Sequence, residues 1–229
     1  MRKTVIFILF FFIGFYTQAQ VIYSSELEER AKAGDSQAQY ELSICYYNGS
    51  GISPDSEQAS FWCKKAAEQG LPDAQFNLGA FYYYGVAVPK DLTKAAEWWL
   101  KAAEQGHADA QYYLGNCYLS GEGVTQDYQQ AVSWYRKAAE QGYIDAQLNL
   151  GNCYCYGYGL PQDYQKAAER YLKAAQQGSP GAQSNLGHAY YKGQGVPQDY
   201  KQAVLWFQKA AQQGFEKAQE ILRSLGETW

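Results

Sequence analysis

The chain has 229 residues, of which 47% are hydrophobic and 17% aromatic, and this composition supplies a buried core for one or two domains. Its formal net charge is −4, with 19 basic residues spread thinly along the chain against 23 acidic ones. This balance disfavours nucleic-acid binding, which requires a concentrated basic surface.

The first residues predict a secretory signal peptide over residues 1–19. Two basic residues precede an apolar run from Val5 to Phe15, and Thr17 and Ala19 fit a cleavage site. This run is shorter than the roughly 20 residues that cross a bilayer as a helix. We therefore expect a secreted or periplasmic protein with no membrane span after cleavage. The alternative is an uncleaved segment that tethers the protein to a membrane.

A period of 36 residues organises the rest of the chain. Ala-Gln pairs recur at this spacing from Ala38 to Ala218 without insertion or deletion, and such a period indicates a solenoid. We expect an all-α fold, an α/α superhelical solenoid of about five such helical hairpins. The predicted segments are an N-terminal capping helix over 20–37, repeats over 38–73, 74–109, 110–145, 146–181 and 182–217, and a C-terminal capping helix over 218–229.

The first half of each repeat predicts a helix, here called helix A. With the alanine of Ala-Gln as position one, Leu stands at position five and Tyr at position nine, as in Ala38, Leu42 and Tyr46. Residues four apart share one side of a helix, so these positions form a stripe that faces the core. A glycine at position twelve, such as Gly49, supplies the left-handed backbone of a helix end.

The second half of each repeat predicts helix B. An aspartate at position eighteen precedes its helical pattern, and its carboxylate can accept hydrogen bonds from the first turn, which predicts an N-cap and not an acid catalyst. Small alanines let the helices approach, and tryptophan fills the space between them. The aspartates are Asp55, Asp91, Asp127, Asp163 and Asp199, and the tryptophans are Trp62, Trp98, Trp134 and Trp206.

The five cysteines leave at least one thiol unpaired within a monomer. Equivalent positions of stacked helices lie about 8–10 Å apart, beyond the roughly 7 Å limit for a disulfide, which disfavours a bridge between Cys117 and Cys153. Cys45 and Cys63, within one hairpin, are the one pair that a bridge could join. Buried thiols are the other interpretation for Cys45, Cys117 and Cys153, which flank the core stripe at position eight.

The pattern A-Q-x-x-L-G-x-x-Y-x-x-G-x-G-V-x-x-D-x-x-x-A-x-x-W-x-x-K-A-A-x-Q-G is nearly complete from Ala110 to Gly142. It resembles the Sel-1-like repeat family, a relative of tetratricopeptide repeats, and five copies cover essentially the whole chain after the predicted signal peptide. The resemblance implies a non-enzymatic scaffold that assembles protein complexes. In bacteria such scaffolds are often exported and engage host or envelope proteins.

Some cysteine-rich bacterial relatives in this family carry paired cysteines that staple neighbouring repeats, and they have been described as β-lactamases or penicillin binders. This chain departs from that pattern, since Ala103 and Ala110 are examples of what stands at the corresponding positions. By this resemblance alone, an envelope hydrolase is the alternative function.

The sequence contains no recognisable catalytic or metal-binding motif. No serine is followed three residues later by lysine, as a penicillin-type nucleophile requires. His107 and His188 have no ligand partners at zinc spacing, so we expect neither a metal nor a cofactor. A catalytic triad assembled from distant positions stays open, because its order in sequence is free.

Positions three, seven, ten and eleven form the other stripe of helix A, which lines the concave groove in related helical-repeat proteins. Tyrosine offers a large contact area at low entropic cost, and asparagine can pair with both N–H and C=O of a peptide backbone. We expect a monomer that binds a protein or peptide ligand there, with Asn116 and Asn152 on the ligand backbone. The alternative is that individual tyrosines pack on adjacent repeats. The predicted binding residues are Tyr40, Phe76, Tyr83, Tyr84, Tyr112, Asn116, Asn152, Tyr156, His188 and Tyr191.

Overall fold

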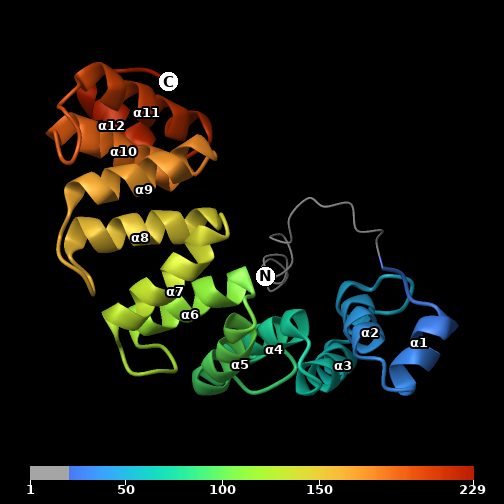
Figure 1. Cartoon of the computed structure of the whole chain (residues 1–229). Coiled ribbons are helices and arrows are strands. Elements are labelled where there is room, and N and C mark those ends of the chain that lie inside the picture. Colours follow the sequence, from blue (N-terminus) through green and yellow to red (C-terminus); the bar gives the residue numbers. More distant parts are fainter. Residues whose placement is uncertain (1–20) are drawn as a thin grey trace. The chain divides into compact units, whose positions relative to one another are not determined.

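The computed structural model describes residues 21–229, so the predicted signal peptide lies outside the described residues. These residues form twelve α-helices and no strand (Figure 1), which confirms the all-α prediction. The helices are α1 (Ser25–Lys32), α2 (Ser36–Asn48), α3 (Ser56–Glu68), α4 (Pro72–Tyr84), α5 (Leu92–Glu104), α6 (Ala108–Ser120), α7 (Tyr128–Glu140), α8 (Ile144–Tyr156), α9 (Tyr164–Gln176), α10 (Pro180–Lys192), α11 (Tyr200–Gln212) and α12 (Glu216–Leu225).

The chain divides into two compact units, one ending at Gln105 and one beginning at Gly106. Helices α2 to α11 alternate between helix A (even numbers) and helix B (odd numbers), and consecutive helices within each unit pack on one another. In the first unit, α1 packs on α2. In the second unit, α12 packs on α11. The two flanking helices therefore cover the outermost hairpins, as terminal repeats of a solenoid must.

The predicted helix ends are confirmed in every repeat. The Asp127 carboxylate, for example, accepts hydrogen bonds from the backbone N–H groups of Gln129 at 2.9 Å and Gln130 at 3.0 Å. Gly121 ends α6 in the left-handed conformation, with φ of 77°. Two residues after each such glycine the turn again needs a positive φ, and there Ala87 is the one non-glycine residue with positive φ within residues 21–229.

The predicted core stripe is confirmed at positions one and five, where alanine and leucine are buried in all five repeats. The position-nine tyrosines are half-buried. The prediction that tryptophans fill the space between helices is confirmed for Trp62 and Trp134, which are buried, whereas Trp98 and Trp206 are half-buried. A lysine ammonium group lies over the Trp98 ring, with Lys101 3.8 Å from the ring centroid. The aromatic residue that fills the core comes one position later in four repeats: Trp99, Tyr135, Tyr171 and Phe207.

Each of these core rings packs against a glycine at position six of helix A. A Cβ atom on Gly151 would lie 2.6 Å from the Tyr171 ring, too close for any real contact. The first repeat has the opposite pair, because Ser43 stands at the glycine position and Cys63 at the ring position. The Ser43 hydroxyl donates to the Ala59 carbonyl oxygen at 2.8 Å. The larger side chain on helix A, serine in place of glycine, thus partly compensates for the smaller side chain on helix B, cysteine in place of an aromatic ring.

A chain of glutamines links successive helices, using the glutamine of each Ala-Gln pair. Gln183 is buried, and its Nε2 donates to the Ala175 carbonyl oxygen in the last turn of α9 at 3.2 Å. Its Oε1 accepts from Gln213, at the end of α11, at 2.8 Å. Carbonyls at a helix end have no partner within the helix, so this glutamine satisfies one of them and joins three consecutive helices. Gln39, Gln75 and Gln147 do the same.

All five cysteines are free thiols, so Cys45 and Cys63 are not bridged. The buried-thiol interpretation is confirmed for position eight, since Cys45, Cys117 and Cys153 are buried. Burial raises the pKa of Cys63 to about 12, the Cys117 pKa also to about 12 and the Cys153 pKa to about 11. Because the thiolate is the reactive form, these thiols are poor nucleophiles at neutral pH.

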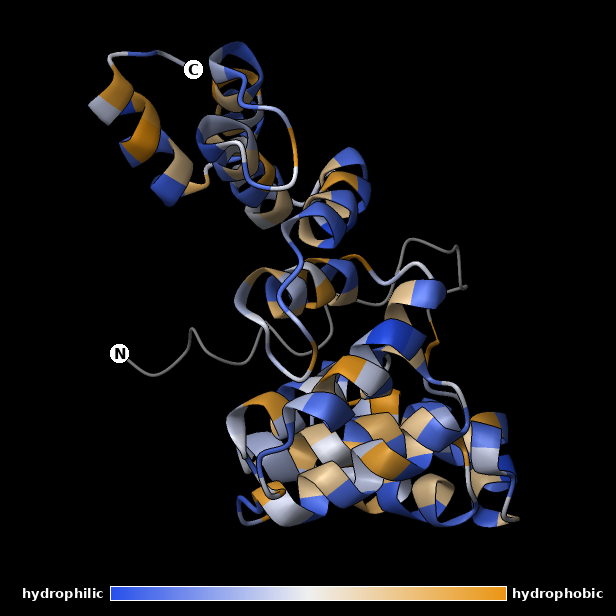
Figure 2. Ribbon diagram, turned by 60° about the vertical axis from the view of Figure 1, so that its left-hand side comes forward, coloured by the Kyte–Doolittle hydropathy of each residue, from blue (hydrophilic) through white to orange (hydrophobic). Residues whose placement is uncertain are grey.

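Figure 2 shows hydrophobic and hydrophilic residues alternating along the individual helices. This pattern is typical of helices that bury one face and expose the other. Among residues 21–229, no helix is long and apolar enough to span a membrane.

Candidate functional site

Position seven of helix A carries polar side chains in the second unit only. Asn116 on α6 accepts two hydrogen bonds at its Oδ1, from the Tyr135 hydroxyl at 2.6 Å and from Asn149 Nδ2 at 3.2 Å. The donors come from α7 and α8, the next two helices. The scaffold itself therefore fixes the orientation of the Asn116 carboxamide.

Asn152 repeats this arrangement one repeat later. Its Oδ1 accepts from the Tyr171 hydroxyl at 2.9 Å and from Asn185 Nδ2 at 3.1 Å. Its own Nδ2 donates no hydrogen bond to any residue from 21 to 229. An amide oxygen has two lone pairs, and both are used here. The sequence predicted that Asn152 pairs with both the N–H and the C=O groups of a ligand backbone. Because its oxygen is already occupied, only its N–H groups are available, and these can donate to a carbonyl oxygen.

The surroundings of Asn116 differ in one respect. Tyr112 lies one turn earlier on α6, where its ring stacks on Tyr143 with centroids 5.0 Å apart. Burial raises the pKa of Tyr112, and hydrogen bonds from Asn116 and Asn149 partly offset that rise. At the position of Tyr112, the next repeat has Leu148 one turn before Asn152. Both asparagines are half-buried.

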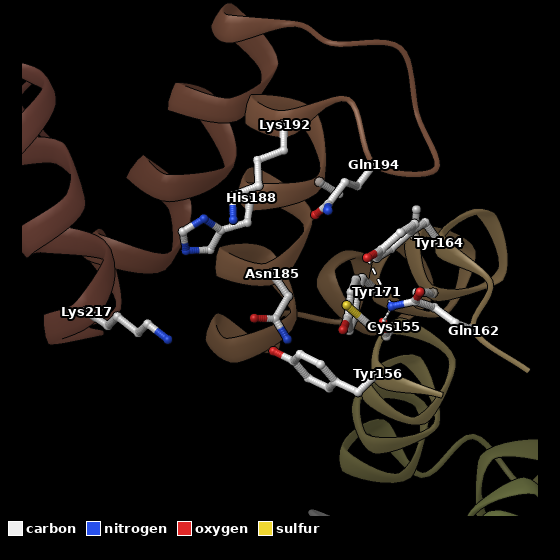
Figure 3. Close-up of a pocket in the computed structure, with 13 residues that line it drawn as sticks. Cys155, Tyr156, Gln162, Tyr164, Tyr171, Asn185, His188, Lys192, Gln194 and Lys217 are labelled. Atoms are coloured by element: carbon white, nitrogen blue, oxygen red, sulfur yellow. Dashed lines mark hydrogen bonds between the residues drawn. The ribbon is translucent and has the colours of Figure 1, made fainter. Parts of the chain in front are cut away.

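A pocket of about 300 Å³ lies in the second unit (Figure 3). Its side chains come from α8, α9, α10, α12 and two inter-helix turns. Tyr156 and His188, two of the predicted binding residues, line it, and in Figure 3 the Tyr156 hydroxyl points toward Asn185. The remaining lining residues are Cys155, Gln162, Tyr164, Ala167, Ala168, Tyr171, Ala189, Lys192, Gln194 and Lys217.

The charged groups of this pocket are all potential cations. Lys192 and Lys217 approach it from α10 and α12, and no aspartate or glutamate lines it. The pKa of His188 lies below its ordinary value, first because the ring is partly buried and then because of the charges on Lys217 and Lys192. The pocket therefore has a positive potential that favours an anionic group.

Two predicted tyrosines of the second unit, Tyr156 and Tyr191, are exposed at its surface. Tyr156 is 63% exposed, and its ring centroid lies 5.6 Å from that of Tyr158. Tyr158 in turn stacks on Tyr128 at 5.0 Å. Tyr191 is also exposed and lies 6.2 Å from Tyr200, measured between ring centroids. These exposed rings give the second unit apolar contact area at its surface, and Tyr156 also lines the pocket.

Four predicted residues belong to the first unit and do not join this site. Tyr40 is buried, and its hydroxyl accepts a hydrogen bond from Asn77 Nδ2 at 3.0 Å. Phe76 and Tyr83 are half-buried, and Tyr83 packs 5.3 Å from Trp99 between ring centroids. Tyr84 is exposed. The Tyr40 contact agrees with the alternative that individual tyrosines pack on adjacent repeats, whereas Tyr83 packs within its own repeat.

Sequence reasoning missed Lys192, Lys217 and Asn185, because their convergence depends on contacts between repeats. Tyr158 could have been noticed from its position between the two turn glycines. The other repeats have Ser50, Val86, Glu122 and Gln194 there. Within residues 21–229, no group of three or more His, Cys, Asp and Glu side chains is arranged to hold a metal.

The model of the Sel1 repeat matches the chain five times, over residues 36–71, 72–107, 108–143, 144–179 and 180–215. The chain belongs to the Sel1 repeat family. These repeats begin at the first residue of each helix A, two residues before the Ala-Gln origin used above. Members of this family are generally scaffolds for protein interactions.

Solved structures agree with this assignment. c5321, a protective antigen present in uropathogenic Escherichia coli strains that displays an SLR fold, is 39% identical with a TM-score of 0.81. The match covers 88% of this chain but only 44% of c5321. A Sel1 repeat protein from Oxalobacter formigenes is 34% identical with a TM-score of 0.79, covering 86% of this chain and 85% of that protein. These matches confirm the predicted solenoid class. No curated protein matches the chain.

Proposed function

We propose that this Sel1 repeat protein is a non-enzymatic scaffold that binds an extended segment of another protein on the helix A face of its second unit. Asn152 carries the proposal, because its oxygen is held by Tyr171 and Asn185 while its N–H groups have no partner among residues 21–229. A fixed amide donor at a surface position suits recognition of a backbone carbonyl, which every peptide offers.

The spacing of the site supports an extended ligand. Asn116 and Asn152 occupy the same position in consecutive repeats, and packed helices lie about 8–10 Å apart. An extended chain rises about 3.3 Å per residue, so about three ligand residues correspond to one repeat. Exposed tyrosines beside the asparagines, including Tyr156 and Tyr191, supply contact area for the intervening side chains.

The N-terminal pattern supports an exported location for this scaffold, in the periplasm or outside the cell. The hydrolase alternative gains no support from the described residues, because the cysteines at position eight are buried with raised pKa values. We therefore retain the binding function alone.

The test is selection of binding peptides from a displayed library, followed by affinity measurement on variants. Asn152→Asp keeps an oxygen acceptor for Tyr171 and Asn185 but removes the N–H donors. We expect it to weaken the selected peptides about tenfold, equivalent to one well-made hydrogen bond. Asn77→Ala, which removes an interior hydrogen bond in the first unit, is the matched control. Equal affinity of the wild-type protein and Asn152→Asp would refute the proposal.

A further inference from the structure

We propose that the pocket beside His188 binds a carboxylate group of the peptide ligand, so that the scaffold prefers segments with an acidic side chain or a free C-terminus. This inference rests on the proposed function and names the ligand chemistry of the same face. It rests on three observations: the charges that line the pocket, the hydroxyl groups at its edge and the bond that connects it to Asn152.

Neither of the two lysines of the pocket has an ionic or aromatic partner among the described residues. Elsewhere several lysines are engaged, as Lys166 is with the Asp163 carboxylate at 3.0 Å and Lys137 is with the Trp134 ring at 3.9 Å. Lys192 and Lys217 make no ion pair or ring contact within residues 21–229. They come from α10 and α12, so helix packing brings two unpaired positive charges to one cavity.

Hydroxyl donors complete a carboxylate site. The Tyr164 hydroxyl oxygen accepts from Gln162 Nε2 at 3.0 Å, which leaves its own hydrogen available to donate. Figure 3 shows this pair on the side of the pocket opposite His188 and Lys192. A carboxylate accepts several hydrogen bonds at once, and bonds from charged donors are the strongest of these. A cavity of about 300 Å³ is large enough for an acidic side chain or a chain terminus.

Asn185 connects the pocket to the peptide site. It lines the pocket, and its Nδ2 donates to Asn152 Oδ1 at 3.1 Å. A ligand carbonyl bound to Asn152 therefore lies next to the pocket. The following ligand residues can then place a carboxylate between Lys192 and Lys217. The two positions together would recognise a backbone and one charge, which gives sequence preference to an otherwise general peptide site.

The experiment uses three tripeptide probes with the wild-type protein, read through the ring resonances of His188 in an NMR titration at low salt. Acetyl-Tyr-Gly-Glu-amide carries only a side-chain carboxylate. Acetyl-Tyr-Gly-Gln carries only a main-chain carboxylate, and acetyl-Tyr-Gly-Gln-amide carries neither. We expect at least one acidic probe to bind about tenfold more tightly than the neutral one. Whichever probe gains affinity identifies the source of the carboxylate.

The variants separate this inference from the proposed function. The double variant Lys192→Met, Lys217→Met should abolish the tenfold gain, while Lys173→Met, Lys201→Met makes the same charge change away from the pocket and should preserve it. If the three probes bind equally, or if both double variants lose the gain equally, the carboxylate inference is overturned. In that case, binding of the neutral probe that still depends on Asn152 would leave the proposed function standing. If no probe perturbs His188 at millimolar concentration, the inference also fails.

Discussion

The first and second units share one scaffold but differ at position seven of helix A, where we propose that a ligand binds. Position seven is Ile44 and Ala80 in the first unit, and Asn116, Asn152 and His188 in the second. The capping aspartates, turn glycines and glutamine links are common to both units. The comparison teaches that the residues repeating without change build the fold, which leaves the residues that change from unit to unit available for the binding function that we propose.

A second difference concerns packing. The first repeat pairs Ser43 with Cys63, whereas the repeats of the second unit pair a glycine with an aromatic ring, as Gly151 does with Tyr171. The tyrosine hydroxyls at this position in α7 and α9 also donate to Asn116 and Asn152, so the glycine makes room for the rings that orient these asparagines. The first repeat has no hydroxyl there and no asparagine to orient.

The largest expected effect concerns the turn that follows helix A. A Cβ on Gly195 would lie 2.0 Å from the Tyr164 carbonyl oxygen, at a φ of 74°. We expect Gly195→Ala to lower the free energy of unfolding by about 3 kcal/mol or more, from backbone displacement and left-handed strain. In the first unit the equivalent residue is Ala87, and Ala87→Gly should raise stability by about 0.5 kcal/mol. Urea unfolding measures both, and effects of the same sign would break the comparison.

The next effect tests the glycine–ring pairing. We expect Gly151→Ser to cost about 2 kcal/mol, because its Cβ would meet the fully packed Tyr171 ring. Tyr171→Cys, which copies Cys63, should cost about 2–3 kcal/mol through lost burial, because the cysteine keeps part of the side-chain volume. Made together, the two substitutions should cost less than their sum by about 1 kcal/mol, because the clash is gone. A double-mutant cycle by urea unfolding checks this, and strict additivity would show that the two positions are independent.

A smaller effect should be equal in both units. Gln105 donates to the Gly70 carbonyl oxygen and to Gln75, and Gln141 makes the same bonds to Gly106 and Gln111. Each Gln→Ala variant should lose about 1 kcal/mol, as expected for replaceable, partly exposed hydrogen bonds. Thermal unfolding of the two variants measures the difference. Values that differ by more than about 1 kcal/mol would show that the glutamine links are not equivalent.

The smallest effect is a pH dependence confined to the second unit. The His188 pKa is lowered in the folded protein by burial and by Lys217 and Lys192, and the ring of Phe207 packs edge-on against it. The unfolded chain therefore binds the proton more readily, so this group costs nothing well above pH of about 6.5 and lowers stability as the pH falls below it. His188→Gln should flatten this decline in urea midpoints between about pH 7 and pH 5. An unchanged slope would contradict the assignment.

The sequence was sufficient to predict the features that depend on neighbouring residues. Helix ends at Gly121 and Asp127 follow from local backbone geometry, and the buried stripe of alanine and leucine follows from helical periodicity. Position seven was one of four positions of helix A predicted to line a groove, and it is polar in the repeats of the second unit. Whether Asn116 and Asn152 contact a ligand stays a prediction.

Features that depend on contacts between repeats could not be predicted from one sequence. Asn152 is oriented by residues 19 and 33 positions later, Tyr171 and Asn185. Lys192 and Lys217 meet at the pocket only because α12 packs on α11. We predicted the tryptophans of helix B as core residues and not the residue that follows each of them. Hydrophobicity alone does not tell which of two adjacent aromatic residues is fully buried.

The central claim is that the ligand binds on α6, α8 and α10 of the second unit. Amide chemical-shift mapping tests it most directly, using a peptide selected from the displayed library and the wild-type protein beside Asn152→Asp. The account predicts shifts concentrated near Asn116, Asn152 and His188, and their loss in Asn152→Asp. Shifts confined to α1 to α5, or undiminished in the variant, would contradict it.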